Sequence, residues 1–407
     1  MKRVVVTGTG TLSALGSDWS RVEAGLRRRT NAVRRMDDWE RYTEMSTRLG
    51  APIDFEPPAH WSRKQLRGMG RVSQLAVRAA ELALEDAGLL GDPLLKSGQV
   101  GVACGSSIGS TADISDFAQM LLSGSSPRLN ANSYVRMMPH TTTANVGIFF
   151  GLKGRIIVTS TACTSGSQGV GFAYEAVRNG QQTVMLGGGA EELCPSEAMA
   201  FDLLYATSRR NDQAHTTPRP YDRDRDGLVI GEGAGMLVLE EYEHARARGA
   251  RIYGEVVGFG TNSDGSHVTR PEAATMQIVM ELALRDAGLP AGAIGYVNGH
   301  GTATEQGDIA ETQATAGLFG PSMPISSQKS YLGHTLGACG ALESIFSLGM
   351  MRAGWFAPTL NLDHVDPRCG ELDYVTGDGR DLDVEYVMNN NFAFGGVNTS
   401  LIFKRMS

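Results

Sequence analysis

The residue best suited to covalent chemistry is a cysteine that follows an apolar run. Ile156 to Val158 predicts a short strand, and Cys163 comes soon after it, where a helix to about Val177 is predicted to begin. The dipole and the unpaired N–H groups of a helix start favour a thiolate over a thiol. Cysteines at helix starts also serve structural roles, so Cys163 needs partners before it counts as a nucleophile.

Candidate partners lie in the second half of the chain, in three segments rich in glycine, histidine and small polar residues. These segments are Val297 to Thr304, Ser326 to His334, and Asn389 to Asn398. A single histidine is usually a structural hydrogen-bonding residue. However, His300 and His334 both stand beside glycines at predicted strand ends, which favours a role in proton transfer or charge stabilisation.

A repeat indicates how the chain is organised. Glu81 to Leu89 recurs as Glu281 to Leu289 with one difference in nine positions. Each copy predicts the end of an amphipathic helix with a glycine cap, and each leads into an apolar strand, Val100 to Ala103 or Ile294 to Val297. A good helix ending could arise twice, but the matched strands favour duplication. We therefore expect two halves, residues 1–250 and 251–407, in an α/β/α/β/α arrangement with the active site near their pseudo-twofold axis.

Further predicted elements support this division. The opening strands of the halves are predicted at Arg3 to Val6 and Ile252 to Val257, with later strands at Met236 to Leu239 and Met323 to Ile325. Two polar segments are expected to be irregular. Arg209 to Asp226 predicts a surface loop, and Gly109 to Asn132 predicts a dimer contact or a cap over a pocket.

Composition excludes several classes of protein. Of the 407 residues, 42% are hydrophobic, and the net charge of −7 argues against general nucleic-acid binding. The five cysteines are scattered without CxxC spacing, which favours neither a disulfide framework nor a zinc site. No apolar run approaches the roughly 20 residues of a membrane span, and the N-terminal run is too short for a signal peptide, so we expect a cytoplasmic protein.

Two short motifs resemble ligand-binding loops but lack residues that such loops require. Gly8-x-Gly10 lacks the third glycine and the acidic partner of a dinucleotide loop. Asp222-x-Asp224-x-Asp226-Gly227 starts like a calcium loop but has no acidic residue at the twelfth position, so a salt-bridged turn is expected.

Five motifs in order give the chain a family resemblance. They are Thr161-Ala-Cys163-Thr-Ser-Gly166, Arg219-Pro-Tyr-Asp222-x-x-Arg225-Asp-Gly227, Asn298-x-His300-Gly-Thr302-x-Thr304, Lys329-x-x-x-Gly333-His334 and Phe392-x-Phe394-Gly-Gly396. From Arg3 to about Lys404 the sequence resembles the elongating β-ketoacyl-[acyl-carrier-protein] synthases, types I and II, of the thiolase-like fold.

The resemblance implies a two-step condensation. Cys163 would take an acyl chain from an acyl carrier protein as a thioester, with the N–H groups of Cys163 and Phe394 receiving the oxyanion. Malonyl-carrier protein would then lose carbon dioxide, and His300 and His334, neutral and protonated on Nε2, would stabilise the enolate. The substrates would be attached to the phosphopantetheine of the carrier protein, and the enzyme would bind no metal or cofactor of its own.

The resemblance also assigns supporting roles. It implies an active-site lysine with its buried partner (Lys329, Glu343), hydroxyls for the phosphopantetheine arm (Thr302, Thr304), gating phenylalanines (Phe392, Phe394), an acyl-pocket residue at a dimer interface (Ile108), and a carrier-docking helix (Arg63, Lys64, Arg67). Asp308 and Glu311 are expected to organise loops. For Lys329, a direct electrostatic role and a purely orienting ion pair both stay open.

Departures from the family pattern concern the substrate. Ala393 replaces the usual glycine of the gate, Gly299 replaces the usual alanine before His300, and residues 132–150 match poorly. We therefore expect a specialised acyl chain, such as an unsaturated or aryl polyene, in place of a saturated fatty acid.

Two rival functions remain in view. A degradative thiolase would need a second catalytic cysteine in a Cys-x-Gly context, and Cys369 stands in a polar loop without it. A non-catalytic chain-length partner would lack Cys163 and the histidines. A homodimer is expected, and pairing with a degenerate homologue is the alternative.

Overall fold

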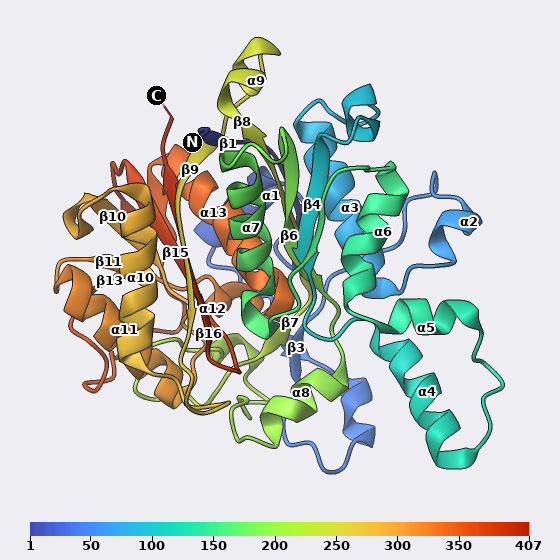
Figure 1. The fold of residues 1–407 in the computed structure, drawn as a ribbon. Helices are drawn as coiled ribbons and strands as arrows, with labels where there is room; N and C mark the ends of the chain where they lie inside the picture. Colours follow the sequence, from blue (N-terminus) through green and yellow to red (C-terminus); the bar gives the residue numbers. More distant parts are fainter. Residues whose placement is uncertain (407) are drawn as a thin grey trace.

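The computed structural model describes residues 1–406, in which strands and helices alternate through both halves (Figure 1). The first half contains β1 (Val4–Leu12), α1 (Trp19–Arg27), β2 (Arg34–Arg35), β3 (Leu49–Ala51), α2 (Arg63–Leu66), α3 (Arg71–Asp86), β4 (Val100–Gly105), α4 (Thr111–Ser123), α5 (Ala131–Met137), α6 (His140–Phe150), β5 (Ile156–Val158), α7 (Ser165–Arg178), β6 (Val184–Glu191), α8 (Pro195–Asp202), β7 (Ile230–Gly231), β8 (Gly233–Glu241) and α9 (Tyr242–Ala247).

The second half repeats the pattern with fewer insertions. It contains β9 (Gly254–Ser263), α10 (Ala273–Ala287), β10 (Ile294–Asn298), α11 (Glu305–Phe319), β11 (Pro324–Ser326), α12 (Lys329–Leu332), α13 (Cys339–Ala353), β12 (Trp355–Phe356), β13 (Asp373–Tyr374), β14 (Arg380–Asp381), β15 (Tyr386–Phe392) and β16 (Val397–Lys404). Across residues 1–406, no helix has the length and apolar character needed to cross a membrane.

The two halves share one strand order. The first sheet runs β5-β4-β6-β8-β1 and the second runs β11-β10-β15-β16-β9, with β13 added beyond β11. The directions also agree, since the first three strands of each order are parallel and the remaining pairings are antiparallel. The edges β1 and β9 pair with each other, which joins the sheets. The expected duplication is therefore confirmed at the level of topology.

Helices separate and cover the two sheets. α7 contacts β4, β6 and β8 of the first sheet and β9 and β16 of the second, while α13 contacts β8 and β15. α3 and α6 cover the outer face of the first sheet, and α10 packs on the outer face of the second beside α11. Figure 1 shows these layers from right to left, with α7 and α13 in the centre. The expected five-layer α/β fold is confirmed.

The repeated helix ends have a shared structural task. Asp86 of α3 accepts a hydrogen bond from the backbone N–H of Thr9 in β1 at 2.9 Å. Asp286 of α10 accepts the equivalent bond from Phe259 in β9 at 3.1 Å. Each aspartate thus ties the last turn of its helix to the opening strand of its half, which explains why the two nonapeptides agree.

Glycines allow these helices to approach the strands closely. A Cβ on Gly10 would stand 1.9 Å from the carbonyl oxygen of Ala79 in α3, and one on Gly260 would stand 2.4 Å from that of Val279 in α10. No side chain fits at such distances. The Gly8-x-Gly10 motif is therefore a packing feature that recurs in the second half.

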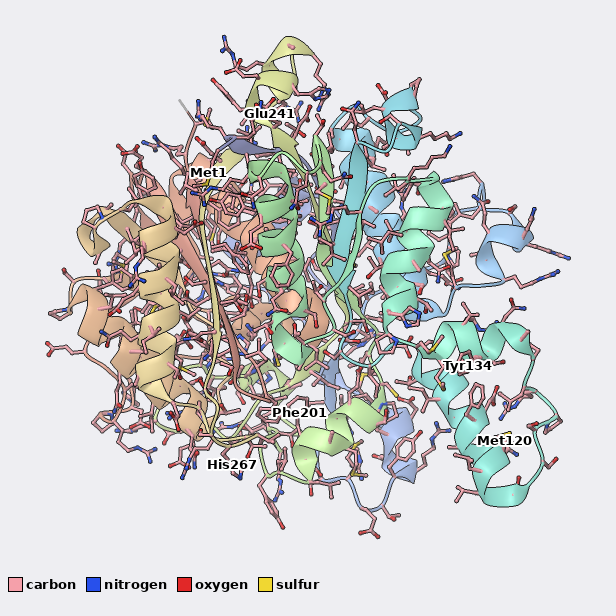
Figure 2. The ribbon with its side chains drawn as sticks, in the orientation of Figure 1. Met1, Met120, Tyr134, Phe201, Glu241 and His267 are labelled. Atoms are coloured by element: carbon pink, nitrogen blue, oxygen red, sulfur yellow. The ribbon has the colours of Figure 1, made fainter. Side chains whose placement is uncertain are left out.

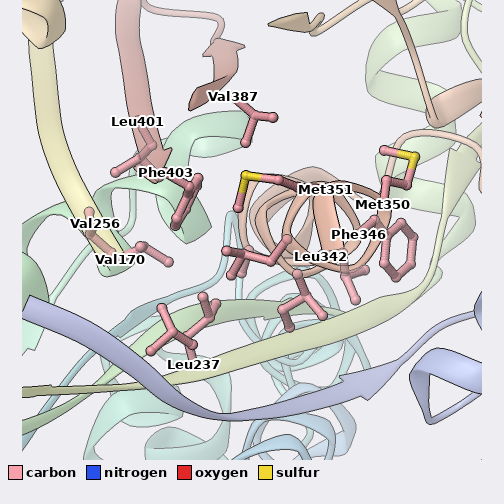
Figure 3. Close-up of a cluster of buried hydrophobic side chains, with 14 of the residues drawn as sticks. Val170, Leu237, Val256, Leu342, Phe346, Met350, Met351, Val387, Leu401 and Phe403 are labelled. Carbon is pink, nitrogen blue, oxygen red and sulfur yellow. The ribbon is translucent and has the colours of Figure 1, made fainter. Parts of the chain in front are cut away.

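The largest apolar cluster surrounds α13. Figure 3 shows this helix among strands of both sheets. The buried side chains there include Leu342, Phe346, Met350 and Met351 of α13, with Leu237 of β8, Val256 of β9, Val387 of β15, and Leu401 and Phe403 of β16. Because α13 is buried on nearly every side, it holds the loop that precedes it in a fixed place.

Residues 109–132 differ from the irregular segment expected. They contain α4 and lead into α5, and only residues 124–130 form the turn between these helices. Gly124, with a φ of +67°, ends α4 in the left-handed conformation that glycine adopts without strain. The two helices project from the body, and Figure 2 labels Met120 and Tyr134 on them. The expectation of an irregular segment was therefore wrong for most of residues 109–132, because the turn-forming residues are confined to the short connection between α4 and α5.

Arg209 to Asp226 also differs from the surface loop expected. Tyr221 and Asp222 within it are fully buried. One carboxylate oxygen of Asp222 accepts hydrogen bonds from the backbone N–H groups of Asp363 and His364 at 2.8 and 2.9 Å. These hydrogen bonds attach the segment to residues 363 and 364 of the second half. Its aspartates Asp222 and Asp226 pair with arginines, which confirms the salt-bridged turn that was expected in place of a calcium loop.

Candidate active site

Cys163 lies in a tight turn between β5 and α7. Residues Ala162–Thr164 form a single 3₁₀ turn, and Ala162 has a φ of +51°, a left-handed conformation that costs energy for a residue with a Cβ. The turn directs Cys163 toward a cavity of about 430 Å³ that it helps to line, although its side chain is only 4% exposed.

The two predicted histidines meet Cys163 in this cavity. Nε2 of His334 lies 2.9 Å from Sγ of Cys163. The rings of His300 and His334 stand nearly perpendicular, with centroids 5.1 Å apart. One nitrogen of each ring and the sulfur lie within 4.8 Å of one another. Three residues from distant parts of the chain therefore converge, as the family resemblance implied.

Hydrogen bonds on the far side of each ring indicate which nitrogen carries the proton. The backbone N–H of Leu336 donates to Nδ1 of His334 at 3.3 Å, and Nδ2 of Asn391 lies 3.4 Å from Nδ1 of His300. Both Nδ1 atoms face donors, so each neutral ring carries its proton on Nε2. Such atoms donate hydrogen bonds into the cavity and offer no lone pair to a metal ion.

Burial keeps both rings neutral. Desolvation and the nearby charge of Lys329 lower the pKa values of His300 and His334 well below the ordinary value for histidine. The site therefore has two neutral N–H donors at physiological pH.

The thiolate expected from the helix start is not favoured. Burial raises the pKa of the Cys163 thiol to about 12, against the opposing effects of Lys329 and of the backbone N–H groups of Phe394 and Cys163. The physical reason is that α7 proper begins only at Ser165 and the sulfur has lost most of its water. The backbone N–H groups of Phe394 and Cys163 nevertheless face the sulfur, where a negative charge would develop.

Lys329 and Glu343 form the buried pair that was expected. Nζ of Lys329 donates to Oε1 of Glu343, and both side chains are at most 4% exposed. Nδ2 of Asn391 donates to Oε2 of Glu343 at 2.7 Å. Burial alone would lower the pKa of Lys329, but the charge and hydrogen bond of Glu343, together with the nearby Cys339 and Glu311, outweigh it and raise that pKa. The amide of Asn391, which faces His300 as well, links the pair to the histidines.

Asp308 and Glu311 hold the loop that carries His300. Glu311 accepts hydrogen bonds from the backbone N–H groups of His300 and Gly301, and Asp308 accepts those of Ala303 and Tyr221. Burial raises the pKa of Asp308 to about 6 and that of Glu311 to about 8. Their contacts agree with the loop-organising role expected of them, although Glu311 also reaches the cavity wall.

Gly299 leaves room for a buried tyrosine of the Arg219 to Gly227 motif, to which the sequence gave no role of its own. A Cβ on Gly299 would stand 2.1 Å from the hydroxyl of Tyr221. Tyr221 is fully buried, and its hydroxyl makes no hydrogen bond. The unusual glycine before His300 is therefore matched to the tyrosine of the Arg219 to Gly227 motif.

The cavity wall contains the other residues assigned to substrate. Thr302 and Thr304 line it, with their hydroxyls 2.9 Å apart, and so do Phe392 and Phe394. Ile108 does not line this cavity and stays a prediction. Cys369 does not line it either, whereas the thiol of Cys339 donates to the carbonyl oxygen of Cys163 at 3.2 Å.

The segment Phe392 to Phe394, which contains the two gating phenylalanines, makes three contacts with other parts of the chain. The ring of Phe394 lies 5.1 Å from that of Phe201, and the ring of Phe392 lies 6.1 Å from that of His300. The N–H of Ala393 donates to the carbonyl of Val397 at 2.8 Å. Phe201, near the end of α8, was missed because a lone phenylalanine carries no local signal; Figure 2 labels it in the lower part of the view, beside α8.

A further residue that no sequence pattern singled out is Glu191, at the end of β6. Its carboxylate accepts hydrogen bonds from the hydroxyl of Ser106 and the N–H of Ser107, both at 2.7 Å, and from the N–H of Gly337 at 3.0 Å. Glu191 is fully buried and lies near Cys163. It thus joins the loops after β4 and β6 to the turn before α13.

The proposed docking residues lie on the surface. Arg63, Lys64 and Arg67 are exposed on and just after α2, whose first turn is held by a capping box from Ser62. None of the three forms an ion pair among residues 1–406. They do not line the cavity, so their role in docking stays a prediction.

Comparisons with known proteins agree over the whole chain. The family described as "Beta-ketoacyl synthase, N-terminal domain" matches residues 1–245, and its C-terminal domain matches residues 253–363. A 3-oxoacyl-[acyl-carrier-protein] synthase 2 of Vibrio cholerae is 40% identical over all of this chain and 99% of its own length.

Solved structures give the same result. A β-ketoacyl synthase from Burkholderia phymatum is 61% identical, with a TM-score of 0.99 and full coverage of both chains. The ishigamide ketosynthase/chain length factor is 33% identical with a TM-score of 0.91, again with full coverage of both chains. A type II polyketide ketosynthase, solved with its acyl-carrier protein and bound to the hexaketide, is 28% identical with a TM-score of 0.89 and the same coverage.

Proposed function

The chain belongs to the β-ketoacyl synthase family, and we propose from this premise how its cavity carries out the condensation. Enzymes of this kind are acyltransferases that form a carbon–carbon bond, and this chain is a 3-oxoacyl-[acyl-carrier-protein] synthase. The single observation that supports the scheme best is the convergence of two N–H donors from imidazoles and two from the backbone on one sulfur.

The first step exchanges one thioester for another. Sγ of Cys163 attacks the acyl carbonyl carbon, the bond to the phosphopantetheine sulfur breaks, and the thiol proton leaves with that sulfur. The N–H groups of Cys163 and Phe394 receive the oxyanion. One such donor is typically worth about 2.7–4 kcal/mol at the barrier.

The second step uses the histidines. The carboxylate of malonyl-carrier protein leaves as carbon dioxide, and the electron pair of the broken bond forms an enolate. Nε2–H of His300 and of His334 donate to the enolate oxygen, which carries its charge only during the reaction. The enolate carbon then attacks the Cys163 thioester and the carbon–sulfur bond breaks, which gives a 3-oxoacyl chain two carbons longer. The released sulfur takes a proton from solvent, and the Cys163 thiol is restored.

An acyl carrier protein delivers both substrates. The hydroxyls of Thr302 and Thr304 on the cavity wall suit the amides of a phosphopantetheine arm, and the exposed cations of α2 suit an acidic carrier. A ketosynthase of the same fold has been solved with its carrier protein. No bound cofactor takes part in this scheme, and the cytoplasmic location stays a prediction.

The two halves of the chain are proposed to contribute different catalytic groups. We assign the nucleophile to residues 1–250 and the two histidines to residues 251–407. The acyl chain is proposed to be a specialised one, of the unsaturated or aryl polyene kind, because the departures at Gly299 and Ala393 lie beside the reacting groups.

A homodimer is proposed through the free edge at β5. Ile156 and Val158 on that strand are 48% and 42% exposed, and Ile148 of the neighbouring α6 is 77% exposed. An open, apolar strand edge normally pairs with another chain. Changing Ile156 to lysine should yield monomers in light scattering, whereas an unchanged mass would refute the pairing. A degenerate homologue in place of the second copy is the alternative.

The catalytic scheme is tested by intact mass. The protein is incubated with carrier proteins bearing different acyl chains, and malonyl-carrier protein is then added. We expect an acyl adduct that Cys163→Ala abolishes and Cys369→Ala preserves, followed by a product two carbons longer. If none of the acyl chains forms an adduct with the protein, the proposed catalytic scheme is overturned.

A further inference from the structure

Strand β15 carries three consecutive asparagines near its end, Asn389 to Asn391, and all of them are fully buried. Successive side chains of a strand point to opposite faces of the sheet. Asn389 and Asn391 therefore share the face that carries Val387, which packs against α13 in Figure 3. Asn390 points the other way, and its amide nitrogen lies 3.2 Å from the sulfur of Met280 in α10. Asn391 is thus directed into the central layer of helices, where the active site lies.

The amide of Asn391 is held in one orientation. Its Nδ2 donates to Oε2 of Glu343 at 2.7 Å, and its Oδ1 accepts from Nδ2 of Asn389 at 3.3 Å. The reverse orientation would set the amide oxygen against a carboxylate oxygen and two NH₂ groups against each other, so neither contact would be a hydrogen bond. Because a buried amide without partners costs free energy, these neighbours fix the orientation.

This orientation leaves the second N–H of Asn391 for His300. Nδ1 of His300 lies 3.4 Å from Nδ2 of Asn391, while Sγ of Cys339, a weaker acceptor, lies 3.6 Å from the same nitrogen. Within residues 1–406, Nδ1 of His300 has no other hydrogen-bond partner. His334 differs, since its Nδ1 accepts from the backbone N–H of Leu336. The tautomer of His300 therefore depends on a side chain, whereas that of His334 depends on the main chain.

The buried ion pair reaches His300 through the same amide. The two oxygens of Glu343 have different partners, since Oε1 accepts from Nζ of Lys329 and Oε2 accepts from Asn391. In the described part of the chain, the Lys329 side chain makes no hydrogen bond to Cys163 or to either histidine. The pair thus has a route by which it orients His300 through Asn391, in addition to its effect on the charge of the site.

We propose that Asn391 is a positioning residue that sets the tautomer of His300. Its N–H group keeps Nδ1 of the ring unprotonated, so the proton stays on Nε2, from which it is donated to the enolate. This inference rests on the proposed function, in which His300 acts in the second step alone. Acylation of Cys163 uses the backbone N–H groups and does not need that proton. Loss of the Asn391 donor should therefore separate the two steps.

The tautomer is measured by NMR on the full-length protein with ¹⁵N-labelled histidine. Protonated and unprotonated nitrogens of a neutral ring give well-separated signals, and the His300→Gln variant identifies those of His300. At neutral pH, where burial keeps the ring neutral, we expect Nε2 to carry the proton. In Asn391→Asp an oxygen replaces the donor, and any proton on the new carboxyl is shared with Glu343. Lone pairs then face Nδ1 of His300, so its proton should move from Nε2 to Nδ1.

The kinetic test compares the two steps on the same proteins. Acylation of Cys163 by a pantetheine thioester is followed by intact mass, and decarboxylation of a malonyl thioester is followed by the release of carbon dioxide. We expect Asn391→Asp to slow decarboxylation by about a hundredfold, which is the usual effect of losing one donor to an oxyanion. Acylation should be nearly unchanged. A purely structural role of Asn391 would slow both steps together.

Asn390→Asp is the matched control. It makes the same chemical change at an equally buried neighbour that faces α10 in place of the active site. A general loss of stability should therefore appear in both variants. The change of tautomer and the selective loss of decarboxylation should appear only in Asn391→Asp.

The outcomes separate the role of Asn391 from the proposed function. The role is overturned if Nδ1 of His300 already carries the proton in the unaltered protein, or if Asn391→Asp leaves the tautomer as it was. It is overturned as well if both steps slow equally. If the unaltered protein forms no acyl adduct with any thioester, the proposed function fails, while the NMR spectra still decide whether Asn391 sets the tautomer.

Discussion

The hydroxyl of Tyr221 occupies the space that a side chain at position 299 would need, since a Cβ built there would stand 2.1 Å from it. Gly299 directly precedes His300, whose Nε2–H is assigned to the enolate. The residue next to a catalytic group is thus dictated by a tyrosine about 80 positions earlier in the chain.

Replacing Gly299 by alanine should therefore displace the His300 loop. We expect kcat to fall by about a hundredfold, because a shift of about 1 Å at a reacting group has effects of that size. The Tyr221→Phe change removes only an unpartnered hydroxyl and should be nearly neutral. In the double variant the overlap is gone, so kcat should recover to within about threefold of the unaltered enzyme. Steady-state rates of the four proteins decide the matter, and a double variant as poor as Gly299→Ala would contradict it.

The buried pair of Lys329 and Glu343 should tolerate neither single loss. Lys329→Met leaves the Glu343 charge without its partner, and we expect the free energy of unfolding to drop by about 3–5 kcal/mol. Lys329→Met combined with Glu343→Leu removes both charges and should cost less than the sum of the single changes. Denaturant unfolding of the three variants measures this. Additive losses would mean that the charges do not interact.

The neutral histidines predict an unusual pH profile. Their pKa values are lowered by burial and by Lys329, so protonation sets in only at pH values below the ordinary range for histidine. Decarboxylation of the malonyl thioester should therefore show no acidic limb from histidine near about pH 6.5. Asp308 and Glu311, which hold the His300 loop, have pKa values raised to about 6 and about 8, so the profile is also recorded for Asp308→Asn and Glu311→Gln. Initial rates at saturating substrate provide the check. A limb centred near about pH 6.5 that persists in both variants would mean that an ordinary imidazole titrates during turnover.

Charge reversal on α2 should affect only substrates that arrive on a carrier. Arg63→Glu with Lys64→Glu is expected to raise KM for acyl-carrier protein by about tenfold while sparing small pantetheine thioesters. Arg21→Glu with Arg246→Glu reverses two other well-exposed arginines, 72% and 60% exposed, and is the matched control. Equal effects on both kinds of substrate would remove α2 from the docking site.

Local patterns were enough to single out candidate reacting groups and the duplicated framework, while the family resemblance supplied the roles of those groups. Cys163 comes soon after an apolar strand, and His300 and His334 stand in glycine-flanked strand ends, so each carries its signal within about ten residues. The nonapeptide repeat revealed the two halves because each copy performs the same local task, a helix end tied to a strand by an aspartate.

Features created by distant contacts could not be predicted in this way. Tyr221 is buried because the second half packs over a stretch that is polar and turn-rich in itself. The pKa of Cys163 depends on how completely the folded chain excludes water, which no helix-start pattern reports. Glu197 stands among residues typical of an exposed helix start, and only tertiary packing shows that it is buried.

Glu191 has a mechanical role in the central layer of two helices. α7 begins just after Cys163, and α13 begins at Cys339, whose thiol donates to the carbonyl oxygen of Cys163. Glu191 accepts N–H groups from the turn before α13 and from the loop after β4, and it is fully buried. The start of a second-half helix is thereby fixed to two strands of the first half beside the nucleophile, so the loss of this one carboxylate would let the two halves of the site shift against each other.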